Sequence, residues 1–97
     1  MAFNIVYSEE KNLLLKATRG IGFEVTIEAI RKGGLMADIA HPSRKRSHQR
    51  LYVVKIGKYA YAVPYVINTE KNTIFLKTVY PSRVLTRKYI KGDDYAK

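Results

Sequence analysis

Basic side chains, histidines and tyrosines are the residues that could carry chemistry in this 97-residue sequence. The densest group is a polar run without helical or strand periodicity, and it contains Arg44, Lys45, Arg46, His48 and Arg50. The planar fork of arginine matches the oxygens of phosphate, and lysine acts as a point charge. Two interpretations stay open: the run contacts phosphate, or it is a mobile loop that only keeps the surface solvated.

A second basic group belongs to the end of the last apolar run. Lys77 lies inside that run, and Tyr80, Arg83, Arg87 and Lys88 follow it. Lys77 either lines a groove beside Arg83 or extends its stem along the sheet so that its ammonium group reaches water. Arg87 and Lys88 fall on a predicted final helix, where they are candidates for contacts with nucleic acid.

The two histidines are candidates for proton transfer. His48 lies among arginines, whose charge favours the neutral imidazole, the form that acts as a base. The opposite interpretation is that His48 is a bystander on a loop, and His41 has less charged context still. With two histidines and no cysteine, the chain shows no metal-ligand spacing. We therefore expect no metal and no cofactor, and we expect Asp93–Asp94 to be an exposed pair.

Eight tyrosines accompany these cations, and the chain has no tryptophan. Tyr59, Tyr61, Val63 and Tyr65 share one face if they lie on one strand, because successive side chains of a strand alternate. Aromatic rings beside cations can stack on RNA bases. The same stripe also suits a buried core or an interface with a protein.

The charge of the chain is one-sided. Lysine and arginine total 18 against 8 acidic residues, which gives a net charge of +10. Glu70 is the only acid between Ile39 and Gly92, and such an imbalance indicates a polyanionic or acidic partner. No apolar run approaches the roughly 18 residues of a membrane helix, and the first residues lack a secretory signal. We therefore expect a cytoplasmic protein.

The N-terminal third predicts a strand and a helix. Phe3–Tyr7 alternates between apolar and polar residues, as a short strand does. Ser8 is a good N-cap for a helix over Glu9–Thr18, and Gly20 suits the position after its end. The inward face of this helix is expected to comprise Leu13, Leu14 and Ala17.

A second helix and a short strand should follow. Phe23, Ile27 and Ile30 recur with the spacing of one helical face. Gly33–Gly34 should end that helix, and Leu35–Ala40 is predicted to form a strand.

The central part of the chain predicts three consecutive antiparallel strands. Their ranges are Leu51–Ile56, Tyr59–Ile67 and Thr73–Tyr80. Gly57-Lys58 suits a two-residue hairpin turn. Pro64 has no amide hydrogen to donate, so we expect a bulge or a bend within the second strand.

These elements predict an α+β protein. Two N-terminal helices should pack on a twisted antiparallel sheet of four to five strands, and Ser82 should cap a short C-terminal helix. Residues 1–97 are expected to form a single domain. Lys91–Lys97 is expected to be a frayed tail.

Two sets of short motifs lie near the ends of the chain. The first set is Phe3, Tyr7-Ser8-Glu9-Glu10-Lys11 and Arg19-Gly20-Ile21-Gly22-Phe23-Glu24. The second set is Pro81-Ser82-Arg83, Thr86-Arg87 and Tyr89. Their order and spacing resemble those of the BrnT-like toxins of bacterial type II toxin–antitoxin modules.

The resemblance implies a RelE-like fold, similar to that of the RelE/ParE superfamily of ribonucleases and gyrase poisons. It also implies a metal-independent endoribonuclease that acts on mRNA. A cognate DNA-binding antitoxin would neutralise the enzyme in a heterotetramer with two toxins. Operator DNA would then be contacted only through the antitoxin.

The leading hypothesis is RNA cleavage by attack of the ribose 2′-hydroxyl on the adjacent phosphate. The candidate catalytic residues are Arg83, Arg50, His48 and Tyr80. The two arginines would stabilise the phosphate, the other two would transfer protons, and Lys77 or Lys88 would add charge. The alternative is a non-catalytic basic module that binds nucleic acid or an acidic protein, for example to inhibit a host protein.

Overall fold

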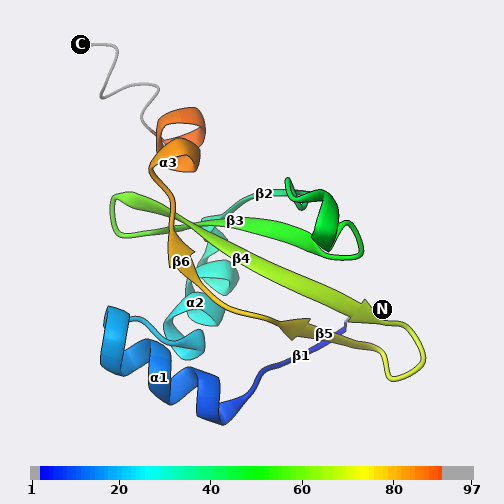
Figure 1. Cartoon of the computed structure of the whole chain (residues 1–97). Helices are drawn as coiled ribbons and strands as arrows, with labels where there is room; N and C mark the ends of the chain where they lie inside the picture. The colour runs from blue at the N-terminus through cyan, green and yellow to red at the C-terminus, as the bar shows by residue number, and fades with distance from the viewer. Residues whose placement is uncertain (1–2, 91–97) are drawn as a thin grey trace.

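The computed structural model describes residues 3–90, which combine three α-helices with six strands in one sheet (Figure 1). In chain order the elements are β1 (Asn4–Val6), α1 (Glu9–Arg19), α2 (Phe23–Ala29), the π-helical turn η1 (Ile30–Gly34), β2 (Leu35–Ala40), the 3-10 turn η2 (Arg44–Arg46), β3 (Arg50–Ile56), β4 (Tyr59–Asn68), β5 (Thr73–Leu76), β6 (Tyr80–Pro81) and α3 (Arg83–Tyr89). The predicted α+β class is confirmed. The expected tail and the Asp93–Asp94 pair lie outside the described residues.

The sheet is mixed, which corrects the prediction of an antiparallel sheet of four to five strands. Its order is β1-β5-β4-β3-β2, and β6 pairs with β4 beside the end of β5. β1 runs parallel to β5, with Ile5 opposite Ile74, and all other pairs are antiparallel. The alternation of a short strand predicts its two faces but not the direction of its neighbour, so the parallel pair could not be foreseen.

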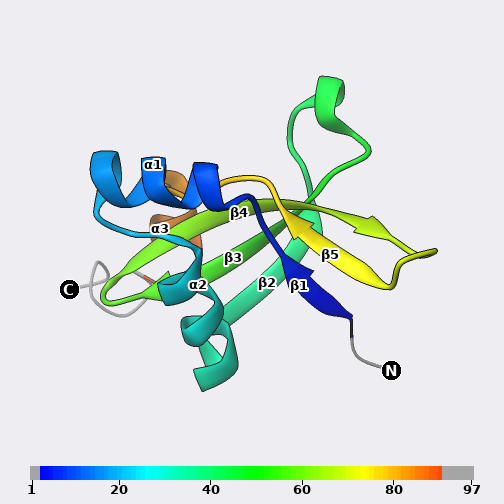
Figure 2. The same cartoon turned by 90° about the horizontal axis from the view of Figure 1, so that it is seen from below.

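The two faces of the sheet bury different clusters. One face, the α2 face, packs Val54, Val63 and Leu76 against Leu15 and Phe23 of the first two helices. The other face, the α3 face, buries Leu51, Val53, Ala60 and Ala62 with residues of α3. Figure 2 shows α2 on one side of the strands and the turn between β2 and β3 projecting from the other.

Helix α1 begins and ends as predicted, but it buries a different face. Ser8 Oγ accepts a hydrogen bond from the Lys11 amide at 3.2 Å, and Gly20 adopts a left-handed φ of 74° after the last turn. The prediction that Leu13 and Leu14 point inward is wrong, because their side chains are 64% and 53% exposed.

The buried residues of α1 are Asn12 and Leu15. Gly22, the N-cap of α2, has no side chain to accept a hydrogen bond, and Asn12 Oδ1 accepts the Phe23 amide instead at 2.7 Å. This contact between the two helices requires Asn12 to face the core. It therefore accounts for the rotation of α1 away from the predicted face.

The β3–β4 hairpin follows the predicted turn. Gly57 has a φ of 67°, and Ile56 lies opposite Tyr59 across it. The pairing then runs without a shift to Arg50 opposite Tyr65, so no bulge disturbs this ladder at Pro64.

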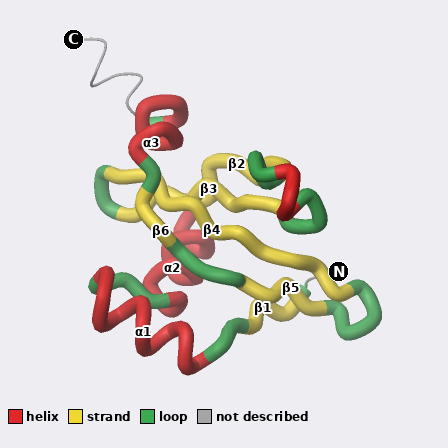
Figure 3. Tube along the Cα trace, viewed as in Figure 1, coloured by secondary structure: helices red, strands yellow, loops and turns green. Residues whose placement is uncertain are grey.

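The expected strand Thr73–Tyr80 is interrupted, which is a further correction. Pairing with β4 stops at Leu76 and resumes at Tyr80, and the segment between them is a loop (Figure 3). Pro64 lies opposite this gap, and its carbonyl accepts the Lys77 amide at 2.8 Å. The missing amide hydrogen of Pro64 is tolerated because no strand runs beside it there.

No helix among residues 3–90 combines the length and the apolar character that crossing a membrane requires.

Candidate nucleic-acid interface

The α3 face carries polar side chains where the buried cluster ends. Leu51 of β3 lies opposite Pro64 of β4. On the other side of β4, the hydrogen bond from the Lys77 amide to the Pro64 carbonyl places Lys77 opposite Pro64. Two residues from Pro64 along β4, Tyr80 lies opposite Ala62. Because paired residues share a face, Lys77 and Tyr80 emerge on the same side of the sheet as Leu51.

The β2–β3 pairing extends beyond the strand ends and adds two more residues to this face. Ala40 lies opposite Arg50, and the His41 amide donates to the Gln49 carbonyl at 3.3 Å. His41 and Gln49 therefore lie opposite each other. Since side chains alternate, they point away from the face that Arg50 occupies.

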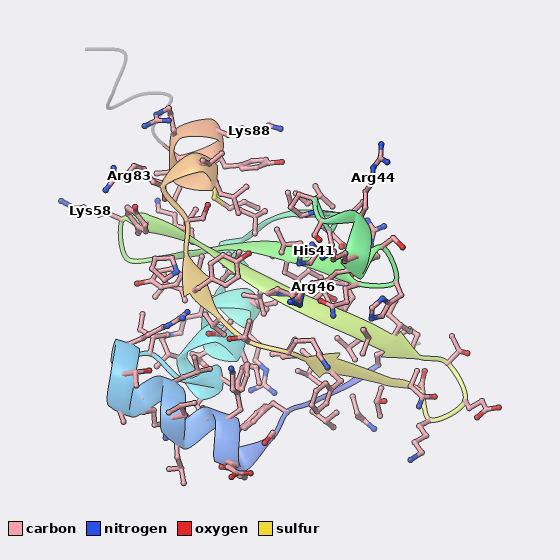
Figure 4. The ribbon with its side chains drawn as sticks, in the orientation of Figure 1. His41, Arg44, Arg46, Lys58, Arg83 and Lys88 are labelled. Carbon is pink, nitrogen blue, oxygen red and sulfur yellow. The ribbon has the colours of Figure 1, made fainter. Side chains whose placement is uncertain are left out.

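The polar run between these residues folds back on itself as a tight turn. The Arg46 amide donates to the Ser43 carbonyl at 3.1 Å, and the Gln49 amide donates to the Arg46 carbonyl at 2.8 Å. The side chains of His41 and Arg46 lie together over the sheet, whereas Arg44 points away from it (Figure 4). Only part of this basic run is thus directed at the sheet.

These residues enclose a hollow of about 320 Å³, which we call the basic hollow. Its lining comprises His41, Arg46, Gln49, Pro64, Lys77, Thr78 and Tyr80. They come from the middle of β4, from β6, from the turn η2 and from the residues just outside β2, β3 and β5. The three ion pairs within residues 3–90 involve neither Arg46 nor Lys77, so both cations are available to an anionic ligand.

His41 is held in one neutral form. Its Nδ1 accepts a hydrogen bond from the Ser43 amide at 3.1 Å, so the proton of the neutral ring is on Nε2. Burial lowers the pKa of His41, and the nearby charges of Arg46 and His48 lower it further. His41 is therefore a neutral hydrogen-bond donor near pH 7.

The segment that carries Lys77 and Tyr80 is anchored from α1. Arg19 Nη1 donates to the Val79 carbonyl at 2.8 Å, and the Val79 side chain is buried in the core of the α2 face. The Lys77 ammonium lies 5.4 Å from the centroid of the Phe75 ring. Phe75 is half-buried and precedes Lys77 by two residues, so the two side chains share one face of the sheet.

A larger hollow of about 470 Å³ shares Tyr80 with the basic hollow. Its other lining residues are Arg19, Tyr61 and Pro81. Its only arginine is Arg19, which already donates to the Val79 carbonyl. The basic hollow, with two unpaired cations, is the better site for a polyanion.

Of the residues predicted to act together, the structure brings Arg46, Lys77 and Tyr80 into the basic hollow. The exposed residues Arg44, Lys45 and His48 lie on the turn outside its lining. Arg83, Arg87 and Lys88 belong to α3 and do not line the basic hollow, and Figure 4 shows Arg83 and Lys88 on that helix, apart from His41 and Arg46.

Arg50 lies on the opposite, α2 face. Its Nε donates to Asp38 Oδ1 at 3.1 Å, and its Nη2 donates to the Asp38 carbonyl at 2.9 Å. Tyr65 donates its hydroxyl to the same carboxylate oxygen at 2.6 Å. Asp38 thus joins β2, β3 and β4.

The tyrosine stripe faces α2 and not the basic hollow. Tyr65 is buried and stacks on Tyr52 with ring centroids 4.0 Å apart. Burial raises the pKa of Tyr65, and the hydrogen bond to Asp38 raises it further. For Tyr65 the structure agrees with the core interpretation, and the rings near the hollow are Phe75 and Tyr80.

No pattern in the sequence singles out Gln49, Thr78 or Phe75 as site residues, and His41 has little charged context there. Extending the β2–β3 alternation past both strand ends would have placed His41 beside Gln49. That step requires the register of the pair, which the short strand Leu35–Ala40 does not determine. Within residues 3–90, no cluster of three or more His, Asp or Glu side chains could hold a metal ion.

In comparisons with known proteins, the chain matches no family model, no curated protein and no solved structure. The likeness to BrnT-like toxins and the RelE-like arrangement therefore stay predictions from short motifs.

Proposed function

We propose that this protein is a metal-independent endoribonuclease that binds RNA in the basic hollow. The single observation that supports the proposal is the convergence of Arg46, Lys77 and His41 on one concave site from two segments, the β2–β3 connection and the loop after β5. Two unpaired cations and a neutral N–H donor match the oxygens of a phosphodiester. The net charge of +10 would attract RNA from a distance.

In the proposed reaction, the ribose 2′-oxygen attacks the adjacent phosphorus and the 5′-oxygen leaves. Arg46 and Lys77 would stabilise the pentavalent phosphate, whose charge exceeds that of the ground state. His41 would donate its Nε2–H to a phosphate oxygen, because its Nδ1 is occupied by the Ser43 amide. Tyr80 can protonate the leaving oxygen through its hydroxyl.

The chemistry differs from that expected around His48 and Arg50. No carboxylate lines the basic hollow, and the imidazole there is a donor, so the 2′-hydroxyl would lose its proton to solvent hydroxide. The cleavage rate should then rise with pH above neutrality. A bell-shaped profile centred near neutral pH would instead require a side-chain base.

The biological role rests on the motifs at the two ends of the chain. We propose a toxin of a type II toxin–antitoxin module with a RelE-like fold that acts on mRNA in the cytoplasm. A cognate DNA-binding antitoxin would neutralise it in a heterotetramer and would make the contacts to operator DNA. The α+β architecture is compatible with this role.

The test compares two double variants of equal charge. Arg46→Ala with Lys77→Ala removes both cations of the hollow, and Arg44→Ala with Lys88→Ala removes one arginine and one lysine outside it. With a defined mRNA in EDTA, we expect the first to lose at least 100-fold in cleavage rate and the second to stay within threefold of wild type. Equal losses would refute the site.

The non-catalytic binding module is the second outcome of the same experiment. In that case the wild-type protein would bind the RNA without cutting it, and only the variant of the hollow would lose affinity. Absence of RNA binding by the wild-type protein would refute both functions.

A further inference from the structure

Gln49 is an unusual buried polar residue. Four polar residues are buried within residues 3–90, namely Asn12, Thr26, Gln49 and Thr86. The other three have side-chain hydrogen bonds to the backbone, for example Thr26 Oγ1 to the Gly22 carbonyl at 3.0 Å. The Gln49 backbone is bonded on both sides, but its carboxamide has no partner in this part of the chain.

The carboxamide of Gln49 is open to the basic hollow. Asn12 Nδ2 is the one side-chain atom of the described residues that is sealed from solvent without a partner. The unpartnered amide of Gln49 must therefore be reached by solvent, although the residue is only 6% exposed. Gln49 lines the basic hollow, so this is where a ligand can meet its donor and its acceptor.

The surroundings of this amide are rich in donors. His41 presents Nε2–H, and Arg46 and Lys77 have only donors. The Gln49 oxygen is thus an acceptor set among donors, beside an amide nitrogen that donates. A ligand with one donor and one acceptor side by side would replace the solvent at both groups of this amide and would satisfy them within the hollow.

We propose that Gln49 reads an adenine base of the RNA, an inference that rests on the proposed function. Adenine places its amino group next to a ring nitrogen that accepts, and a carboxamide binds both at once. Arg46 and Lys77 hold the phosphate next to this base, as in the proposed function. Gln49 therefore determines specificity and takes no part in the bond rearrangement.

A second base fits beside the first. Phe75 precedes Lys77 by two residues on the same face, and the Lys77 ammonium, which lies 5.4 Å from the centroid of its ring, belongs to a residue that lines the basic hollow. The Phe75 ring, partly exposed beside Lys77, can stack a neighbouring base of either type. The ligand is therefore single-stranded RNA with adenine at one position.

The test measures the affinity of oligouridines that carry A, G, C or purine riboside at one central position. The nucleotide on the 5′ side of each cleavable phosphate is 2′-deoxy, so that nothing is cut. We expect the wild-type protein to bind the adenine oligonucleotide about tenfold more tightly than the others. Purine riboside lacks the amino group, so equal affinity for it and adenine would overturn the proposal without any variant.

Gln49→Glu then provides a switch that a structural role would not produce. A carboxylate has only acceptors, and the N1–H and amino group of guanine are adjacent donors. We expect this variant to prefer guanine over adenine while its affinity for the oligouridine background stays within threefold. An unchanged preference for adenine would refute the assignment of Gln49. Absence of binding to every oligonucleotide would instead refute the proposed function.

Discussion

At the scale of single residues, the two faces of the sheet use polar groups in different ways. On the α2 face one carboxylate oxygen of Asp38 accepts hydrogen bonds from both Arg50 and Tyr65. On the α3 face, Arg46 and Lys77 have no ion-pair partner within residues 3–90. The first group stabilises the fold, and the second group is available to a ligand.

The hydroxyl of Tyr65 should contribute to stability in a pH-dependent way. Tyr65→Phe should lower the free energy of unfolding by about 1 kcal/mol at pH 7, since the acceptor Asp38 is partly exposed. The folded pKa of Tyr65 is raised, so its contribution is complete below about pH 10 and is lost as the pH rises further. Urea unfolding at pH 8 and pH 11 should show a smaller loss in the variant than in wild type.

His41 should destabilise the folded state in acid. Its folded pKa is lowered, so below about pH 6.5 the unfolded chain takes up a proton that the folded ring resists. The melting temperature of wild type should therefore fall more steeply between pH 7 and pH 5 than that of His41→Gln. Parallel curves for the two proteins would contradict the neutral, Ser43-bonded imidazole.

At the scale of elements, the helix caps and the hairpin turn are the features that the sequence predicts most closely. Ser8, Gly20 and Gly57 act through their own backbone neighbours, so helix α1 and the β3–β4 hairpin could be predicted closely. The rotation of α1 could not, because it depends on the long-range bond from the Phe23 amide to Asn12. A helical pattern with three consecutive leucines also leaves the buried face ambiguous.

The rotation of α1 can be checked with two neighbouring leucines. Leu15 is 2% exposed and Leu14 is 53% exposed. Leu15→Ala should cost about 2–5 kcal/mol of unfolding free energy through lost burial and a cavity. Leu14→Ala should cost less than about 0.5 kcal/mol. Denaturant unfolding of both variants gives the comparison, and equal costs would restore the predicted inward face.

The loop between β5 and β6 should depend on its anchor in α1. Arg19→Ala removes the bond to the Val79 carbonyl and should cost about 1 kcal/mol of stability. Lys77 and Tyr80 would lose their fixed positions, so we expect cleavage to fall about tenfold. Arg31→Ala removes an exposed arginine from η1 and serves as the control. Full activity of Arg19→Ala at a temperature where it is folded would show that the loop needs no anchor.

At the scale of the whole molecule, the basic hollow is a product of topology. Its lining joins residues near 41–49 to residues near 64 and 77–80, and only the strand order brings them together. The one-sided charge predicted a polyanion site, and Arg46, Lys77 and Tyr80 were among its candidates. The choice between these and Arg50 or Arg83 required the register and the interruption after Leu76, which no local pattern encodes.

Salt dependence separates the overall charge of +10 from the specific hollow. For single-stranded nucleic acid, each neutralised phosphate adds about 0.7 to the slope of log affinity against log salt. Arg46→Ala with Lys77→Ala should therefore reduce the slope by about 0.7, because both cations contact one phosphate; the slope is measured by fluorescence anisotropy with an uncleavable RNA. Arg44→Ala with Lys88→Ala changes the net charge equally, but the two residues lie outside the hollow, so its slope should stay unchanged. If both variants lose the same slope, RNA senses only the net charge, and the concave arrangement of cations has no role in binding.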